Sequence, residues 1–217
     1  VKGDEGGRGC VKNKPLVMPR GEILAGASTE EGTWNAFTDR STDNGRTWQR
    51  AENVDVVDEA GVIQPTLWAS PGDDQQVHML IRSDAGAIYR ADSADGGATW
   101  GPAKRTKLPN NNSGLDVVLL GKTLVLAYNP TAGNWVSRYP LRLSVSDDNG
   151  QNWTKHFDIE TSPGEYSYPA IVPWHTNLGF HLTYTWNRER IVYASMSLEE
   201  LLTRATPAPL SAQVAGA

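Results

Sequence analysis

The chain has 217 residues and a net charge of -5 at pH 7, because it carries 25 acidic and 20 basic side chains. This balance excludes the basic footprint of a nucleic-acid-binding protein, so an anionic partner must be held by a few placed arginines. No run approaches the roughly 20 apolar residues that cross a bilayer, and the first residues lack a signal-peptide core. We therefore expect a soluble chain with no membrane partner, and its single Cys10 leaves the compartment undetermined.

Residues 1–13 are rich in glycine and charge, which predicts a loop or a frayed edge. From Lys14 onward, short apolar runs return in four cycles and predict an all-β chain of four blades, each with about four strands. The blades are expected at residues 14–60, 61–108, 113–160 and 164–202. Within them, strands are expected at residues 15–18, 22–27, 34–41, 63–68, 77–81, 87–92, 115–120, 123–128, 141–145, 168–172, 179–185 and 191–195.

The pattern Ser-x-Asp-x-Gly-x-x-Trp occurs three times, in residues 41–48, 93–100 and 146–153. The three serines are 52 and 53 residues apart, a period that is typical of propeller blades. In each copy the aspartate and the glycine suit a tight turn that the tryptophan covers, so Asp43, Asp95 and Asp148 are interpreted as fold residues.

The fourth cycle ends differently from the first three. Ser197-Leu-Glu199 stands where the next turn is expected, but it lacks the glycine and the tryptophan of a complete copy. A short helical turn is predicted at residues 198–202. The last residues, 203–217, are rich in alanine and proline, and we expect them to form a poorly ordered tail.

Alignment of the first strands of the four cycles matches Lys14, Gln64, Asp116 and Tyr168, which are 50, 52 and 52 residues apart. In a propeller the first strand of each blade lines the central axis, so these polar side chains would converge at one mouth of the channel. The alternative is that they are solvated strand ends. Asn112 lies in the polar loop that leads into Asp116 and could line the same mouth.

Two arginines are candidates for binding an anionic group. Arg82 ends a second strand, where other cycles have Tyr128 and Tyr184, and Arg138 lies eight residues before a turn serine. Two guanidinium groups aimed at one axis would suit a carboxylate, since each can donate two parallel hydrogen bonds. The four histidines show no metal-ligand spacing, so neither a metal nor another cofactor is expected.

These residues resemble the sialidase (neuraminidase) family, whose propellers carry Asp-box repeats of this form, and the similarity covers residues 14–202. Arg82 and Arg138 match two arginines of the family's carboxylate-binding triad, and the Tyr166-Ser167 pair matches the motif of its nucleophilic tyrosine. The resemblance implies an exo-acting glycoside hydrolase that releases terminal sialic acid or a related acidic sugar. It also implies a propeller of six blades, of which four are visible here.

The chain departs from this pattern in two respects. Gln64 stands where the family has the glutamate that activates the tyrosine, and an amide cannot take a proton. Glu165 should point to the face opposite Tyr166, so Asp116 is the better candidate for the base. The family's opening blades, with its first arginine and its acid/base aspartate, have no match. Another chain or a missing segment could complete the ring, or four blades could close on themselves.

Three functions therefore stay open, and all of them have an acidic glycan or sialoside as the partner. The first is sialidase-like hydrolysis with Tyr166 as the nucleophile, which the isolated chain need not perform. The second is a propeller that binds an acidic glycan without cleaving it, as Gln64 favours. The third is a hydrolase or lyase for uronic-acid sugars that uses Asp116, Tyr168 or Lys14. Tyr184 is a further candidate for contact with the sugar.

Overall fold

The structure is a computed structural model that describes residues 11–208. Within this range it consists of antiparallel sheets and a single helix, α1 (Leu198–Arg204), which confirms the all-β prediction and the expected helical turn. The residues fall into two compact units, one ending at Thr106 and the other beginning at Lys107. No helix in the described range is long and apolar enough to cross a membrane.

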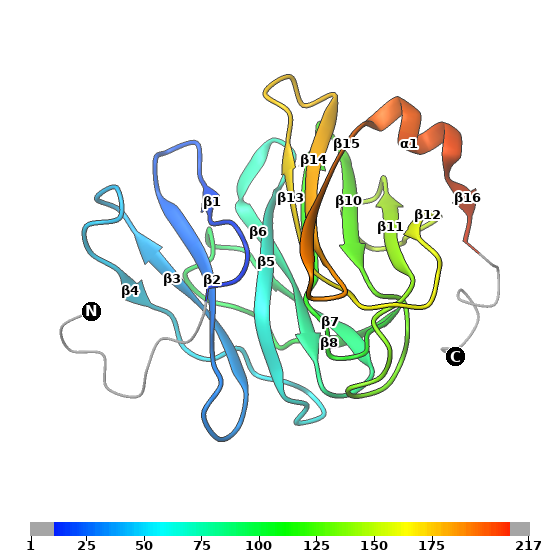
Figure 1. Cartoon of the computed structure of the whole chain (residues 1–217). Coiled ribbons are helices and arrows are strands. Elements are labelled where there is room, and N and C mark those ends of the chain that lie inside the picture. The colour runs from blue at the N-terminus through cyan, green and yellow to red at the C-terminus, as the bar shows by residue number, and fades with distance from the viewer. Residues whose placement is uncertain (1–10, 209–217) are drawn as a thin grey trace. The chain divides into compact units, whose positions relative to one another are not determined.

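The first unit contains two four-stranded sheets in which each strand pairs with the strand before it in sequence (Figure 1). This up-and-down order is the topology of a propeller blade. The strands β2 and β3 pack against β5 and so place the two sheets face to face around a core that includes Leu24, Val62 and Met79. The strands are β1 (Leu16–Val17), β2 (Ile23–Thr29), β3 (Asn35–Ser41), β4 (Gln49–Arg50), β5 (Val62–Ser70), β6 (Asp73–Ser83), β7 (Ala87–Ser93) and β8 (Lys104–Pro109).

The second unit contains a five-stranded sheet, in the order β16-β12-β11-β10-β9, and a three-stranded sheet, in the order β13-β14-β15. The last blade therefore has three strands in place of the four expected, because the chain continues into α1 and β16 joins the preceding sheet. The strands β9 and β10 pack against β13, around a core that includes Val125, Leu143, Phe180 and Leu182. The strands are β9 (Asp116–Leu120), β10 (Thr123–Tyr128), β11 (Leu141–Ser146), β12 (Lys155–Glu160), β13 (Tyr166–Pro173), β14 (Gly179–Trp186), β15 (Arg190–Ser197) and β16 (Thr206–Pro207).

The three Asp-box copies form the turns between the third and fourth strands of their blades, as predicted. In the first, Ser41 Oγ accepts a hydrogen bond from the Gly45 amide at 2.8 Å, and Asp43 Oδ1 accepts one from the Thr47 amide at 2.8 Å. Gly45 has a φ of 80°, which is accessible to glycine without a steric cost. The same bonds recur in the other two copies. The aspartates therefore hold the fold.

The end of the chain differs from the predicted tail. Ser197 accepts a hydrogen bond from the Glu200 amide and caps α1, where a complete repeat would make its turn. After the helix, Thr206 and Pro207 pair with His156 and Lys155 of β12. Because β12 is an edge strand with open backbone groups, even a short segment can add to it. The rest of the predicted tail, from residue 209, and most of the predicted N-terminal loop, residues 1–10, lie outside the described residues.

Candidate functional site

In the first unit, Arg82 lies at the end of β6 with only 3% of its surface exposed. Its Nη1 donates to Gln64 Oε1 at 3.0 Å, and its guanidinium lies 5.8 Å from the ring centre of Trp34. The Nε2 of Gln64 then donates to Glu30 Oε1 at 3.1 Å. The amide of Gln64 thus bridges a buried cation and an exposed carboxylate. Glu30 was not found in the sequence because it comes from the β2–β3 loop, away from any repeat position.

Only two of the four residues aligned on the first strands share an unusual backbone conformation. Gln64 and Tyr168 each precede a proline, each has a left-handed φ, at 56° and 50°, and each lies at a register shift of its strand. Asp116 in β9 instead pairs regularly with Ala127 of β10 and has no left-handed backbone, whereas Asn112, in the loop before β9, has a φ of 60°. The predicted equivalence therefore fits Gln64 and Tyr168 but does not extend to Asp116. Lys14 precedes β1, is half-buried and has no left-handed backbone.

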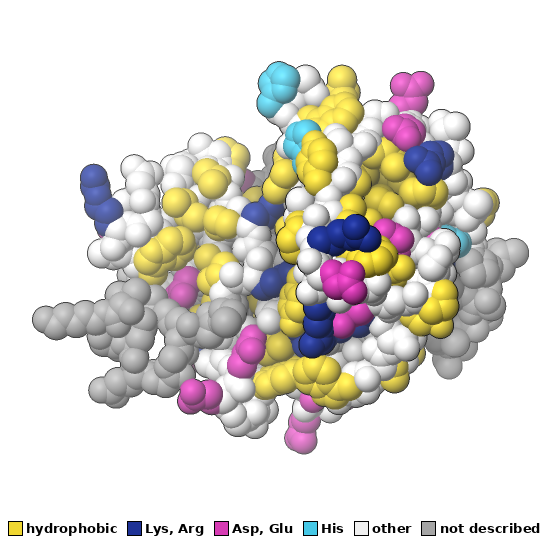
Figure 2. Space-filling model, in the orientation of Figure 1, with side chains coloured by type: hydrophobic (Ala, Val, Ile, Leu, Met, Phe, Trp, Pro, Cys, Tyr) yellow, Lys and Arg dark blue, Asp and Glu magenta, His cyan; other side chains and the backbone are white. Residues whose placement is uncertain are grey.

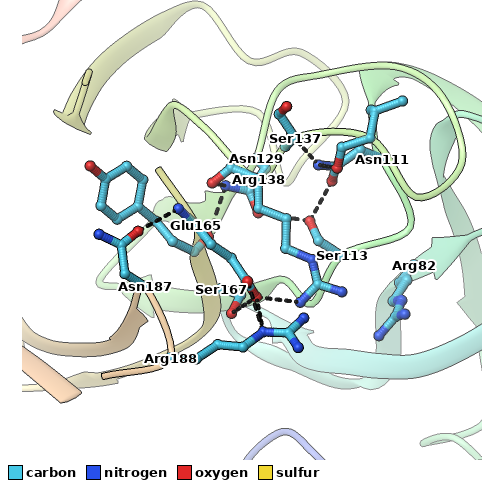
Figure 3. Close-up of polar contacts among 12 residues, drawn as sticks. Arg82, Asn111, Ser113, Asn129, Ser137, Arg138, Glu165, Ser167, Asn187 and Arg188 are labelled. Carbon is cyan, nitrogen blue, oxygen red and sulfur yellow. Dashed lines mark hydrogen bonds and ion pairs between the residues drawn. The ribbon is translucent and has the colours of Figure 1, made fainter. Parts of the chain in front are cut away.

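In the second unit, Arg138 and Arg188 approach one carboxylate, that of Glu165 (Figure 3). The Arg188 Nε lies 2.7 Å from Glu165 Oε2, whereas the Arg138 Nη1 lies 3.5 Å from Glu165 Oε1. The Arg138 side chain is only 10% exposed, and its Nη1 is buried without a hydrogen-bond acceptor. This guanidinium therefore has capacity for a further anionic group.

A pocket of about 280 Å³ lies beside these arginines. Its walls come from the loop before β11, from the segment before β13 and from the β14–β15 turn, and are formed by Trp135, Val136, Ser137, Arg138, Gly164, Glu165 and Arg188. On the face seen in Figure 2, basic and acidic side chains lie next to one another over β14 and β15. The pocket thus combines positive charge with an exposed indole, which is a combination suited to an acidic sugar.

Buried asparagines hold the loop that carries Arg138. The Nδ2 of Asn129 lies 3.0 Å from the carbonyl oxygen of Arg138, and the Nδ2 of Asn111 donates to that of Ser137 at 2.7 Å. Asn112, a predicted mouth residue, is fully buried and donates to Asn134 Oδ1 at 2.8 Å. The geometry gives Asn112 a supporting place in the loop.

Tyr166 and Tyr184 pack in the core of the second unit, and the Tyr166 hydroxyl lies next to Gly164 of the pocket wall. Tyr166 is 2% exposed and Tyr184 is 4% exposed, and their rings meet edge to face. Burial, followed by the charge of Glu160, raises the pKa of Tyr166, and burial also raises the pKa of Tyr184, whose hydroxyl donates to Glu160 at 2.6 Å. Both shifts favour the protonated form of the phenol. The predicted roles of Tyr166 as nucleophile and Tyr184 as a sugar contact stay predictions.

Tyr168 belongs to β13 and lies beside Arg138, which comes from the loop before β11. It is 44% exposed, and its ring centre is 5.3 Å from the Arg138 guanidinium. The expectation that Glu165 and Tyr166 point to opposite faces agrees with the contacts of Glu165 with the arginines and the burial of Tyr166. Tyr168 is therefore the tyrosine that is both accessible and adjacent to a site arginine.

Asp116, the predicted base, is 1% exposed. Its Oδ1 accepts from the Val117 amide at 3.0 Å and its Oδ2 from the Ile171 amide at 2.9 Å, which ties β9 to β13. The Asp116 carboxylate therefore helps to hold its blade to the next one. Its predicted role as the base stays a prediction. Among the described residues, no group of three or more histidine, cysteine or acidic side chains could hold a metal ion.

Sequence reasoning missed Arg188 and the part played by Glu165. One signal was available, since Asn187-Arg188 separates two strand patterns at a point where a tight turn prefers Asn-Gly. An arginine there is unexpected. Arg82 belongs to the first unit and Arg138 to the second, so the predicted clamp of these two arginines stays a prediction.

Comparison with solved structures gives the same fold at low identity. The Hadza microbial sialidase Hz136 matches with a TM-score of 0.71 and 15% identity, over 86% of this chain and 37% of that one. A mutant of the NanB sialidase from Streptococcus pneumoniae matches with 0.68 and 16%, over 86% and 30%. A protein of unknown function from Dyadobacter fermentans matches with 0.65 and 15%, over 84% and 51%.

The fold is therefore a β-propeller of the sialidase type, and the chain spans between 30% and 51% of the length of these three structures. No curated protein matches the sequence. The profile of the BNR repeat-like domain matches residues 6–181, which is most of the chain. The Asp-box turns and the blades lie within or close to that range, and the chain belongs to the family of BNR repeat-like domains.

Proposed function

We propose that the protein is a sialidase-like glycoside hydrolase that releases terminal sialic acid or a related acidic sugar. The observation that carries this proposal is the nearly buried Arg138, whose Nη1 lacks a hydrogen-bond acceptor beside a pocket that also contains Arg188. A carboxylate is the ligand group that guanidinium groups bind best, because both are planar and oppositely charged. The sialidase-type fold supports the choice of an acidic sugar.

The chemistry assigned to Tyr168 is a double displacement at the anomeric carbon. The phenol loses its proton to a base, its oxygen bonds to the anomeric carbon, and the bond to the leaving oxygen breaks as that oxygen takes a proton. Water then attacks the anomeric carbon, loses a proton and releases the tyrosine. A phenol suits this sugar because a carboxylate nucleophile would be repelled by the substrate carboxylate at the same carbon. The Tyr168 ring lies beside Arg138, which would hold that carboxylate.

Turnover of a fluorogenic sialoside by matched tyrosine variants tests this assignment. Tyr168→Phe should lower kcat/KM more than about a hundredfold, since it removes the attacking oxygen. Tyr166→Phe should stay within about threefold of the wild type, because Tyr166 is only 2% exposed. The reverse result would return the nucleophile to Tyr166. No turnover by the wild type, together with saturable binding of sialic acid, would exclude the hydrolase.

A second candidate function is binding of an acidic glycan without cleavage. Two observations favour it: Gln64 cannot take a proton, and the Asp116 carboxylate is occupied by two backbone amides. Hydrolysis or elimination of a uronic-acid sugar would use the same arginines. Completion of the ring by another chain or segment also stays a prediction, which gel filtration and intact mass would test.

A further inference from the structure

The β14–β15 turn places Arg188 in a backbone conformation that disfavours arginine. Asn187 and Arg188 have φ values of 50° and 56°, and the Glu189 amide donates to the Trp186 carbonyl at 3.0 Å. Two central residues with positive φ characterise a type I′ turn, whose second position is normally glycine. Asparagine tolerates this region, but arginine meets a steric cost there. A residue kept at such a position calls for a reason beyond the turn.

The ion pair with Glu165 does not supply that reason by itself. The Arg188 side chain is 73% exposed, and exposed ion pairs contribute little to stability because water competes with them. Glu165 is also shared, since its carboxylate accepts from Ser167 Oγ at 3.3 Å and lies 3.5 Å from the Arg138 Nη1, a distance too long for a good hydrogen bond. The Glu165 carboxylate thus contacts both guanidinium groups, and the Nη1 of the buried Arg138 has no hydrogen-bond acceptor.

A second strained residue lies in the same pocket. Trp135 has a φ of 58°, an uncommon conformation for a bulky side chain, and its indole is exposed. Strained, non-glycine backbone often marks residues whose side chains are needed at a site. Trp135 and Arg188 come from different loops and have in common only this pocket.

We propose that Arg188 is the specificity-determining residue of this pocket, where it binds the carboxylate of an acidic sugar together with Arg138. The ligand carboxylate takes over the guanidinium donors that Glu165 serves incompletely, and the Trp135 indole covers a face of the sugar ring. The proposal rests on the pocket of the proposed function, but it concerns binding and selection and not bond cleavage.

The test compares free sialic acid with its methyl ester, which has the same ring but no negative charge. Both are titrated into the wild-type chain, Arg188→Gly and Arg188→Lys, by calorimetry or ligand-observed NMR, and thermal unfolding is recorded for each. Arg188→Gly is a sharp variant because glycine is the favoured residue of the turn, so the fold should be retained. Arg188→Lys keeps the charge but loses the planar fork.

We expect Arg188→Gly to bind sialic acid at least tenfold more weakly while binding of the methyl ester changes less than twofold, with Arg188→Lys in between. Equal preference for the acid in the wild type and Arg188→Gly would overturn the proposal, as would a wild type that binds neither ligand. A large drop in melting temperature for Arg188→Gly would also overturn it, since Arg188 would then be structural. If the wild type hydrolyses no sialoside but Arg188→Gly loses the preference for sialic acid over its methyl ester, the proposed hydrolysis is refuted and the role of Arg188 in binding is supported.

Discussion

The two units hold their buried arginines in opposite ways. Arg82 of the first unit donates to a neutral amide, that of Gln64, whereas Arg138 of the second unit faces a carboxylate, that of Glu165. A neutral acceptor satisfies hydrogen-bonding capacity but leaves the positive charge available. A carboxylate reduces the charge but competes with an anionic ligand. The Gln64 amide, which is a departure from the sialidase pattern, thus helps to position Arg82.

The side chain that joins the two blades also differs between the units, because it is a hydrogen-bond donor in the first unit and an acceptor in the second. In the first unit, Asn13 Nδ2 lies 3.0 Å from the Gln64 carbonyl and 3.1 Å from the Pro65 carbonyl, and so serves the bulge of β5 as a donor. In the second unit, Asp116 accepts from the Ile171 amide of β13. In each joint a side chain of one blade hydrogen-bonds backbone groups in the first strand of the next blade. The chemical group that bonds one blade to the next therefore differs between the units, although both are built from the same repeat.

Gln64→Glu would make the first unit resemble the second, and we expect the largest effect on stability from it. The new carboxylate loses the donor that now reaches Glu30, so two carboxylates would lie about 3 Å apart. Even with Arg82 beside them, the free energy of unfolding should fall by about 1 to 2 kcal/mol at pH 7. Because a like-charged pair binds a proton more readily, the loss should shrink toward pH 4.5.

Denaturant unfolding at the two pH values measures this effect, and a swap provides the control. The double variant Glu30→Gln with Gln64→Glu restores one amide and one carboxylate, so it should recover most of the stability at pH 7. If Gln64→Glu is as stable as the wild type at neutral pH, the charge of Arg82 is sufficient to compensate both carboxylates, and the prediction is wrong.

Glu165→Gln would make the second unit resemble the first. The amide can still accept from Arg138 and Arg188 but no longer competes for their charge, so sialic acid should bind about tenfold more tightly, equivalent to about 1.4 kcal/mol. Stability should fall by only about 1 kcal/mol, since one of the two ion pairs is exposed. Calorimetry and thermal unfolding measure the two quantities.

The matched control for this variant is Glu189→Gln, which removes the same charge from an exposed side chain next to Arg188 in the same hairpin. It should leave binding within about twofold, because a screened surface charge has little effect at a distance. Weaker binding by Glu165→Gln would mean that Glu165 contacts the ligand itself.

The sequence allowed the turns and the blades to be predicted because their determinants are local. An Asp-box bond joins residues only four apart, such as Ser93 and Gly97, so the pattern contains the whole structure. The site could be predicted only in part. Arg138 was found by its spacing from a turn, but Glu165 and Arg188 meet it from distant segments, and no local pattern encodes that meeting. A simple count of residues along the first strands matched Gln64 with Tyr168 but did not distinguish Asp116, which lies in a regular strand.

The smallest effect is expected at the Asp-box turns, which both units share. Hydrogen bonds from Thr99 and Ser93 outweigh partial burial and lower the pKa of Asp95 to about 2. A carboxyl group whose pKa is lower in the folded chain stabilises it above the unfolded value, near 3.8, and loses that contribution as the pH falls through about 2. Melting temperature should therefore be flat down to about pH 4 and decline below it.

Asp95→Asn should remove part of that decline and cost under about 1 kcal/mol at pH 7, because the turn is exposed to solvent that screens it. Asp148→Asn in the second unit should behave alike, since hydrogen bonds from Asn152 and Ser146 lower the pKa of Asp148 in the same direction. If the two variants differ in acid sensitivity, the turns are not interchangeable, and the contrast between the units extends beyond the arginine clusters to the repeat itself.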